Sequence, residues 1–439
     1  MPGRLEPSFR RDVLRVRWLA VFACLLGAFA MGMTACGDDD DEGGGGGGDS
    51  GGGGGGGTVN VYSSLPLQGA SRPQTTAMVE GIKLALEQRK GKAGETTVKY
   101  TSLDASTAQA GTWTPEATSA NARKVAQDDA AVAYIGEFNS GASAISIPIL
   151  NEVPIAQVSP ANTAVGLTSD EPGADKGEPD KYYPTGERHY LRIVPKDTIQ
   201  GAALATVMAK DGCTSAYILN DKEVYGAGLS RNIEISAKEQ GLEIAANEGI
   251  DPKAPNFRSQ AASIKSSGAD CFVFSGITAN GAVQLYKDVS AAVPDAKLYG
   301  PDGVAESGFA DPKEGGIPAD VAAKVKVSVA TLSPDEYPPE GQKFFEDYEA
   351  KYGEPNPDPY AVYGYEAMDL VLDTCEELGP DCSDKQAMID ALFNTKGRES
   401  VLGAYDIDEN GDTTLTDYGI YTIKDGELVF EETVKAEGA

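Results

Sequence analysis

Residues 131–163 read AVAYIGEFNSGASAISIPILNEVPIAQVSPANT, and this stretch decides the fold. An apolar run at 132–135 fits a buried strand, an apolar segment at 144–150 fits a packed helix, and a second run at 154–158 fits another strand. Small polar or turn-forming residues separate the three segments. We therefore interpret the stretch as a strand–helix–strand unit with parallel strands.

Polar residues follow both strands of this unit. Asn139 and Ser140, which are favourable helix N-caps, come after the first strand, and Asn162 and Thr163 come after the second. Because parallel strands end at the same edge of a sheet, these side chains meet there without filling the space. Open α/β sheets bind ligands at this edge. Ordinary loop chemistry explains the same residues equally well.

Composition limits the possible functions. The chain has 439 residues and a formal net charge of -30, and its length suggests two or three domains. Its acidity argues against a nucleic-acid partner, which requires clustered Lys and Arg. The single histidine, His189, nearly excludes Ser-His-Asp catalysis, Cys-His catalysis and multi-histidine metal sites. We therefore expect no enzyme, no cofactor and no metal.

The N-terminus has the features of a bacterial lipoprotein signal. Arginines precede an apolar run at 18–33, and small residues precede Cys36. The run is short for a membrane span of about 20 residues, although a single membrane anchor is the alternative. We expect residues 1–35 to be a signal peptide and Cys36 to carry a lipid. Residues 36–57, rich in Asp and Gly, would form a flexible tether.

From residue 58 onward, predicted strands and helices alternate in two successive sets, which indicates an α/β fold. The expected surface loop at 166–188 is rich in Gly, Pro, Asp and Glu and separates the sets. Near the end of the chain, 401–407 and 419–423 are expected to pair as a closing hairpin. An EF-hand-like run at 406–417 has β-like flanks, so we do not predict calcium binding.

Four cysteines lie in the folded part, and in an oxidising compartment they are expected to pair. Cys213 and Cys271 each precede a strand of the second set, so their sulfurs can meet if those strands are neighbours. Cys375 and Cys382 flank a helix end and a turn, and they can close a small loop. We predict these two disulfides and no zinc site, because there is no CxxC motif and no nearby histidine.

Short motifs occur in a specific order along the chain. They are PLQGA at 66–70, YIG at 134–136, SPANT at 159–163, QG at 200–201, YGAG at 225–228, GPDGV at 300–304, YA at 360–361 and GD at 411–412. Each motif is weak alone, but their order and spacing together resemble the Leu/Ile/Val-binding family of ABC importers, which are type I periplasmic binding proteins. The resemblance covers roughly residues 58–430.

The resemblance implies where a ligand's charged ends bind. Ser140, Ala161 and Thr163 match family positions that hold the ligand's carboxylate, and Asn139 lies in the same turn. Helix N-terminal amides favour an anion, which agrees with this role. Asp302 matches the acidic residue that meets the ligand's ammonium. The alternative for Asp302 is a plain turn residue in Pro-Asp-Gly.

The resemblance also implies the walls of the site. Tyr225 and Tyr360 match aromatic positions of the family. Another family aromatic falls at Thr278 or Ile277, so Thr278 is a predicted site residue that departs from the pattern. This departure, together with Asp302 in place of a longer Glu, puts the usual branched-chain ligand in doubt.

The fold implied by the resemblance has two doubly wound three-layer α/β lobes joined by about three hinge crossings, near Val194, Thr331 and Val401. The expected boundaries are 58–194 plus 332–401 for lobe 1 and 195–331 plus 402–439 for lobe 2.

These expectations describe an extracytoplasmic, lipid-anchored receptor that closes its lobes on an amino acid or a similar small polar solute. It would be a monomer that delivers the solute to the permease subunits of an ABC importer. No P-loop occurs between a strand and a helix, so the ATPase would be a separate chain. The alternative is a ligand-sensing lipoprotein for amides or nutrients without a transport role. An extracytoplasmic hydrolase and an adhesion protein are weaker alternatives.

Overall fold

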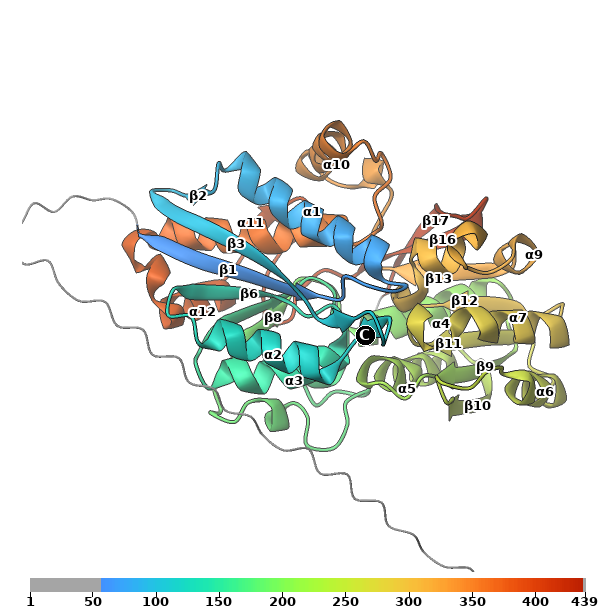
Figure 1. Cartoon of the computed structure of the whole chain (residues 1–439). Coiled ribbons are helices and arrows are strands. Elements are labelled where there is room, and N and C mark those ends of the chain that lie inside the picture. The colour runs from blue at the N-terminus through green and yellow to red at the C-terminus, as the bar shows by residue number, and fades with distance from the viewer. Residues whose placement is uncertain (1–56, 437–439) are drawn as a thin grey trace, which may run out of the picture. The chain divides into compact units, whose positions relative to one another are not determined.

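The strand–helix–strand unit of residues 131–163 lies inside a six-stranded sheet. In the computed structural model, which describes residues 57–436, β6 (Ala131–Gly136) and β7 (Ala156–Ser159) pair in parallel and α3 (Ser140–Asn151) joins them (Figure 1). Every residue of both strands is buried, as their apolar composition requires. The predictions for residues 1–35, for Cys36 and for nearly all of the tether at 36–57 lie outside the described residues.

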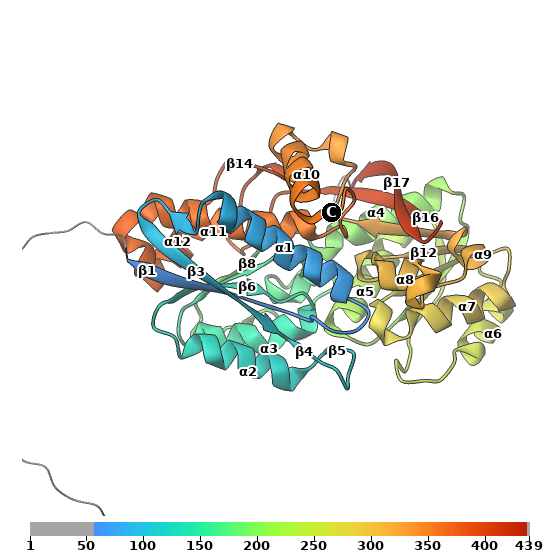
Figure 2. The ribbon, with the colours of Figure 1, turned by 45° about the horizontal axis from the view of Figure 1, so that its top comes forward.

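The first sheet has the order β2-β3-β1-β6-β7-β8. Helices α2 and α3 pack together on one face, while α1 and α11 pack together on the other (Figures 1 and 2). The bounds are β1 (Thr58–Leu65), β2 (Lys92–Ala93), β3 (Thr96–Asp104), β8 (Tyr190–Arg192), α1 (Arg72–Gln88), α2 (Pro115–Ala126), α11 (Ala361–Leu378) and α12 (Lys385–Phe393). A small hairpin, β4 (Ser106–Thr107) and β5 (Thr112–Trp113), follows β3.

The second sheet has the order β10-β9-β11-β12-β13-β16-β17. Its first five strands are parallel, and β16 and β17 add to it in antiparallel fashion. The strands are β9 (Ser215–Asn220), β10 (Glu243–Gly249), β11 (Cys271–Ser275), β12 (Lys297–Gly300), β13 (Val325–Val329), β16 (Asp417–Lys424) and β17 (Glu427–Lys435). The helices around it are α4 (Asp197–Lys210), α5 (Val224–Glu239), α6 (Arg258–Ser267), α7 (Ala282–Ala292), α8 (Ser307–Ala310) and α9 (Ala319–Ala322). Helix α10 (Pro339–Tyr352) follows β13 but packs against α11 of the first set (Figures 1 and 2).

The two sheets with their helices confirm the predicted α/β class. The chain passes between the two sets after β8, after β13 and before β16. These passages agree with the expected crossings near Val194 and Thr331, and the third lies a few residues beyond Val401.

The predicted hairpin between 401–407 and 419–423 is wrong. Instead, β14 (Arg398–Ser400) and β15 (Gly403–Tyr405) pair with each other, and β16 pairs with β13 and β17. A two-residue turn joins β16 to β17, in which Asp425 and Gly426 have φ of 55° and 90°. Asp-Gly is a favoured sequence for such a turn, because both central residues need positive φ.

The segment 166–188 is not simply a surface loop. It contains two short 3-10 turns, Val165–Leu167 and Asp180–Tyr182, and the side chains of Tyr182 and Tyr183 are buried beside α3. Aromatic side chains give the segment its own small apolar cluster, which its Gly- and Pro-rich composition concealed.

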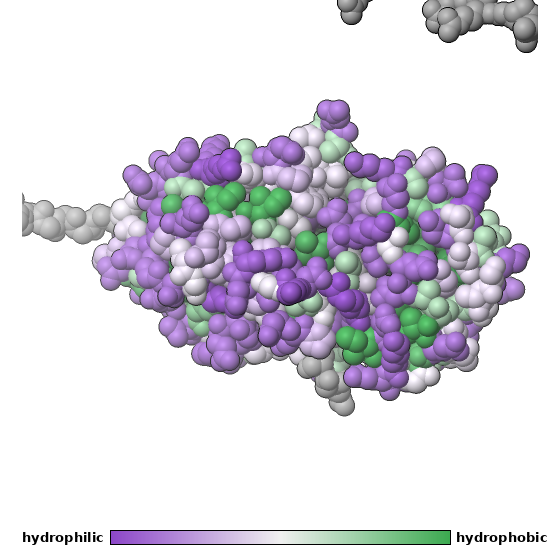
Figure 3. Space-filling model, turned by 90° about the horizontal axis from the view of Figure 1, so that it is seen from below, coloured by the Kyte–Doolittle hydropathy of each residue, from purple (hydrophilic) through white to green (hydrophobic). Residues whose placement is uncertain are grey.

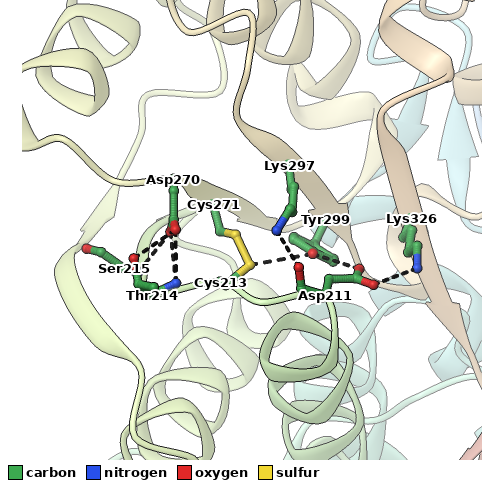
Figure 4. Close-up of a disulfide and its surroundings, with 9 residues drawn as sticks. All are labelled: Asp211, Cys213, Thr214, Ser215, Asp270, Cys271, Lys297, Tyr299 and Lys326. Carbon is green, nitrogen blue, oxygen red and sulfur yellow. Dashed lines mark hydrogen bonds and ion pairs between the residues drawn. A yellow bond between two sulfur atoms is a disulfide. The ribbon is translucent and has the colours of Figure 1, made fainter.

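Both predicted disulfides are present. Cys213 and Cys271 join because β9 and β11 are neighbouring strands, and Cys375 joins Cys382 at the end of α11. Figure 4 shows the first bridge beside the hydroxyl of Tyr299, which lies 3.5 Å from the Cys213 sulfur. The carboxylate of Asp270 accepts hydrogen bonds from the backbone there, so the bridge sits in an ordered turn.

The surface of the described part is mainly polar. On the face drawn in Figure 3, hydrophobic patches are small and separated by hydrophilic residues. Among residues 57–436, Ile235 is the large hydrophobic side chain that is exposed. None of the helices in this part of the chain combines the length and the apolar character that a membrane crossing requires.

Candidate ligand-binding site

A cavity lies between the carboxyl ends of β6 and β7 on one side and the start of α5 and the turn after β12 on the other. The space between these walls measures about 430 Å³ when the part open to solvent is included. Seven of the eight predicted site residues line this cavity: Asn139, Ser140, Ala161, Thr163, Tyr225, Asp302 and Tyr360. The eighth, Thr278, does not, and its neighbour Ile277 lines the cavity in its place.

The first wall is built around the N-terminus of α3. Asn139 is the N-cap residue with extended backbone, and the Ser140 hydroxyl accepts a hydrogen bond from the Ala164 amide at 3.4 Å. The Thr163 hydroxyl and the side-chain amide oxygen (Oδ1) of Asn139 have no hydrogen-bond partner within the described residues, although the two residues are only 1% and 8% exposed. Buried polar atoms normally find partners, so these atoms are available to a ligand.

Asn162, which the sequence places with these residues, does not line the cavity. Its amide donates to the Phe138 carbonyl at 2.8 Å, and its side-chain oxygen accepts from Ser143 and from Tyr190. Asn162 therefore braces the turn, while its neighbours face the ligand space.

A buried ion pair holds the same turn from behind. The Arg192 guanidinium is fully buried, and its Nε lies 2.7 Å from the Asp412 carboxylate. The guanidinium also donates to the carbonyls of Asn162 and Ala164 at 3.1 and 2.8 Å. The charge of Arg192 helps to hold the pKa of Asp412 below its usual range, against the opposing effect of burial. The Gly-Asp motif at 411–412 thus supplies the carboxylate of a buried ion pair.

The opposite wall presents the carboxylate of Asp302, which is 6% exposed. The Tyr225 hydroxyl donates to one carboxylate oxygen at 2.5 Å, and the Tyr360 hydroxyl donates to the other at 2.8 Å. Burial raises the pKa of Asp302, and the tyrosine hydrogen bonds oppose that rise. The two tyrosines fix the carboxylate so that it faces the cavity.

A second buried carboxylate, that of Asp197, lies behind Thr163. Both oxygens of Asp197 lack a hydrogen-bond partner among residues 57–436, and its backbone amide donates to the Thr163 carbonyl at 2.8 Å. Burial, and then the charge of Asp302, raise the pKa of Asp197 well above its usual value. Asp197 could not be identified from the sequence, because it begins α4 outside every matched motif.

Three further side chains that the sequence analysis did not identify line the cavity: Trp113, Phe138 and Glu223. Phe138 and Glu223 lie in the same turns as the predicted residues Asn139 and Tyr225. Their place at the cavity could therefore have been predicted from those turns. Trp113 comes from the β4–β5 hairpin, outside every motif, and only the fold brings it to the cavity.

The known sequences that resemble this chain are binding proteins of one family. A sequence model described as "Periplasmic binding protein" matches residues 58–427. The chain is 23% identical to the leucine-, isoleucine-, valine-, threonine- and alanine-binding protein of Pseudomonas aeruginosa, over 70% of this chain and 75% of that protein. It is 25% identical to the Leu/Ile/Val-binding protein BraC3 of Rhizobium johnstonii, over 68% of this chain and 74% of that protein.

Solved structures share the fold. The leucine-binding protein LivK of Thermotoga maritima superimposes with a TM-score of 0.73 at 22% identity, over 86% of this chain and 99% of that chain. A solute-binding protein of an ABC transporter from R. palustris, solved with benzoate, gives a TM-score of 0.70 at 22% identity. This match covers 86% of the present chain and 96% of the other.

Proposed function

Because this chain belongs to the periplasmic binding protein family, we propose that it is the solute-binding receptor of an ABC importer and that its ligand is an amino acid or a close relative. The fold is that of the type I members, in which two lobes enclose the ligand. Members of the family are solute-binding proteins and work outside the cytoplasm. The relatives named above, which bind branched-chain and small amino acids by their names, support an amino-acid ligand.

The observation that carries this proposal is the pairing of two unlike walls across one cavity. Unpartnered oxygen atoms at Asn139 and Thr163 flank a helix N-terminus, and the Asp302 carboxylate faces them from the other side. The helix N-terminus favours a carboxylate and the buried Asp302 favours an ammonium. An α-amino acid carries both groups on one carbon atom.

Titration calorimetry with the purified chain and a set of amino acids tests the proposal. Asp302→Asn keeps the shape of the side chain but removes its charge, and it should weaken amino-acid binding by about 100-fold, since removing one partner of a buried charge pair costs about 2–5 kcal/mol. Asp335→Asn, on an exposed turn, is the matched control. Unchanged affinity in Asp302→Asn would remove Asp302 from the site.

The finer assignments are part of the same proposal. Residues 58–194 with 332–401 form one lobe and 195–331 with 402–439 form the other, and Tyr360 and Asp302 meet where these lobes close. Cys36 carries a lipid that anchors the monomeric receptor, which delivers its ligand to permease subunits. Mass spectrometry of the membrane fraction tests the anchor, because a diacylglycerol on Cys36 has a characteristic mass. A sensor without a transport role is the second candidate, and uptake of labelled ligand by cells lacking this chain decides between the two.

A further inference from the structure

The mouth of the cavity holds a carboxylate that the structure leaves without an evident role. Glu223 is half-buried at the start of α5, lines the cavity and does not cap the helix with its side chain. Within residues 57–436 no hydrogen bond or ion pair is recorded for this carboxylate. Burial, and then the charge of Asp221, raise the pKa of Glu223. The Glu223 carboxylate therefore has no cationic partner among residues 57–436.

An indole ring lies beside this carboxylate. A Cβ atom placed on Gly141 would lie 2.9 Å from Cζ2 of Trp113 and 3.2 Å from Oε2 of Glu223. The ring and the carboxylate therefore converge over the same glycine in the first turn of α3. An indole ring and a carboxylate at one spot form a favourable place for a positive charge, because a cation over the face of an aromatic ring gains about 0.5–2 kcal/mol.

The charges around the cavity are unbalanced. Among the described residues that line it, Asp302 and Glu223 are acidic and none is Lys, Arg or His. Asp197 adds a further buried carboxylate behind Thr163. An amino acid with an uncharged side chain brings one ammonium and one carboxylate, which Asp302 and the α3 N-terminus can satisfy. Such a ligand has no positively charged group left to pair with the Glu223 carboxylate.

We propose that the ligand is a cationic amino acid, whose side-chain ammonium or guanidinium lies between the Glu223 carboxylate and the Trp113 ring. This assignment rests on the proposed function and specifies the ligand class of the same site. The α-amino and α-carboxylate groups bind at the inner end, at Asp302 and the α3 N-terminus. The side chain then extends past Ile277 and Phe138 to the mouth.

Calorimetry with L-lysine, L-arginine, L-norleucine and cadaverine tests the ligand class. Norleucine lacks only the terminal ammonium of lysine, and cadaverine lacks only the α-carboxylate. We expect lysine or arginine to bind about 10-fold or more tightly than norleucine, which corresponds to about 1.4 kcal/mol. Equal or tighter binding of norleucine overturns the inference but leaves the proposed function intact. Binding of cadaverine alone overturns the inference together with the amino-acid ligand of the proposed function. Binding of none of these compounds overturns the inference, while the proposed function falls only if the wider set of amino acids fails as well.

Glu223→Gln tests whether the preference for a cationic side chain comes from Glu223. It should weaken binding of the cationic amino acid about 10-fold while changing norleucine affinity by less than about 3-fold. Glu239→Gln makes the same charge change at an exposed position at the end of the same helix and should leave both affinities unchanged. If Glu223→Gln changes both affinities equally, Glu223 does not recognise a side-chain cation and the inference is wrong.

Discussion

Arg192 shows how one buried side chain fixes the geometry of the ligand space. Its guanidinium donates to Asp412 and to the carbonyls of Asn162 and Ala164, so it ties the turn that carries Thr163 to a distant part of the chain. Buried charges are costly unless hydrogen bonds satisfy them, and each nitrogen of this guanidinium donates at least one. The position of the Thr163 hydroxyl therefore depends on a contact between residues far apart in sequence.

Arg192→Met should destabilise the protein by about 3–5 kcal/mol, because it leaves the Asp412 carboxylate buried with its main partner removed. Urea unfolding followed by circular dichroism measures the loss. The double variant Arg192→Met with Asp412→Asn should recover part of the lost stability, since neither charge of the buried pair remains. Lys343→Met, which breaks an exposed pair with Asp347, is the control and should leave the unfolding midpoint nearly unchanged. A similarly small change for Arg192→Met would contradict the role given to the buried pair.

At the scale of elements, the two disulfides close loops of very different length. Cys213 and Cys271 are separated by 58 positions and Cys375 and Cys382 by 7. In the chain-entropy account a bridge stabilises more when it closes a longer loop, at about 4 kcal/mol for the first and about 2.5 kcal/mol for the second. The first bridge also joins two neighbouring strands of one sheet.

Replacing both Cys213 and Cys271 by Ala should therefore lower the free energy of unfolding more than replacing both Cys375 and Cys382. Denaturant unfolding of the two double variants, each compared with the oxidised parent chain, gives the two losses. The opposite order would mean that local packing and not loop closure governs the bridges.

The turn between β16 and β17 is a second test at this scale. A Cβ on Gly426 would lie 2.9 Å from the Asp311 carboxylate, and the residue has a φ of 90°. Gly426→Ala should therefore cost about 1–2 kcal/mol, measured by thermal or urea unfolding. Asp425→Asn should be tolerated, because Asn readily adopts positive φ. An unaffected Gly426→Ala variant would show that the hairpin does not depend on this turn geometry.

The elements that the sequence predicted well are those with a strong local signal. Buried parallel strands such as β6 and β11 are short apolar runs with turn residues at their ends, so their positions follow from composition. The closing hairpin failed because the Asp-Gly turn at 425–426, a local signal, was passed over. Trp113 and Asp197 were missed for a different reason: their place in or behind the cavity arises only from long-range packing.

At the scale of the whole described unit, an acidic cluster lies where the two sets of elements meet. Glu306 is 1% exposed, and the Ser71 hydroxyl at the start of α1 lies 3.4 Å from its carboxylate. The Thr278 hydroxyl also faces the Glu306 carboxylate. The charges of Asp358 and Asp302 add to the rise in the pKa of Glu306. Burial raises the pKa of Glu306 to about 7 and that of Asp358 to about 6.

This shift makes stability depend on pH. In the folded chain Glu306 keeps its proton up to about pH 7, whereas the unfolded chain releases it near its ordinary pKa of 4.5. The contribution of Glu306 is therefore fully present below about pH 4.5 and is lost as pH rises to about 7. We expect the melting temperature of Glu306→Gln to fall less than that of the parent chain between pH 5 and 7.5.

Differential scanning fluorimetry across this range measures the two slopes. Glu409→Gln, at an exposed position, makes the same change in net charge and should keep the parent slope. Parallel curves for the parent chain and Glu306→Gln would mean that the carboxylate is not buried at this junction.

The late arrival of β16 and β17 in the sequence has a consequence for the order of events in the cell. The second sheet takes most of its strands from residues 215–329, yet β13 gains its second neighbour only from residues 417–424. The first sheet likewise has its strands complete by residue 192 but receives α11 and α12 from residues 361–393. Neither core can close while the last fifth of the chain is still being made. Both cores are therefore completed only when nearly all of the chain has been made, which suits a family whose members work outside the cytoplasm.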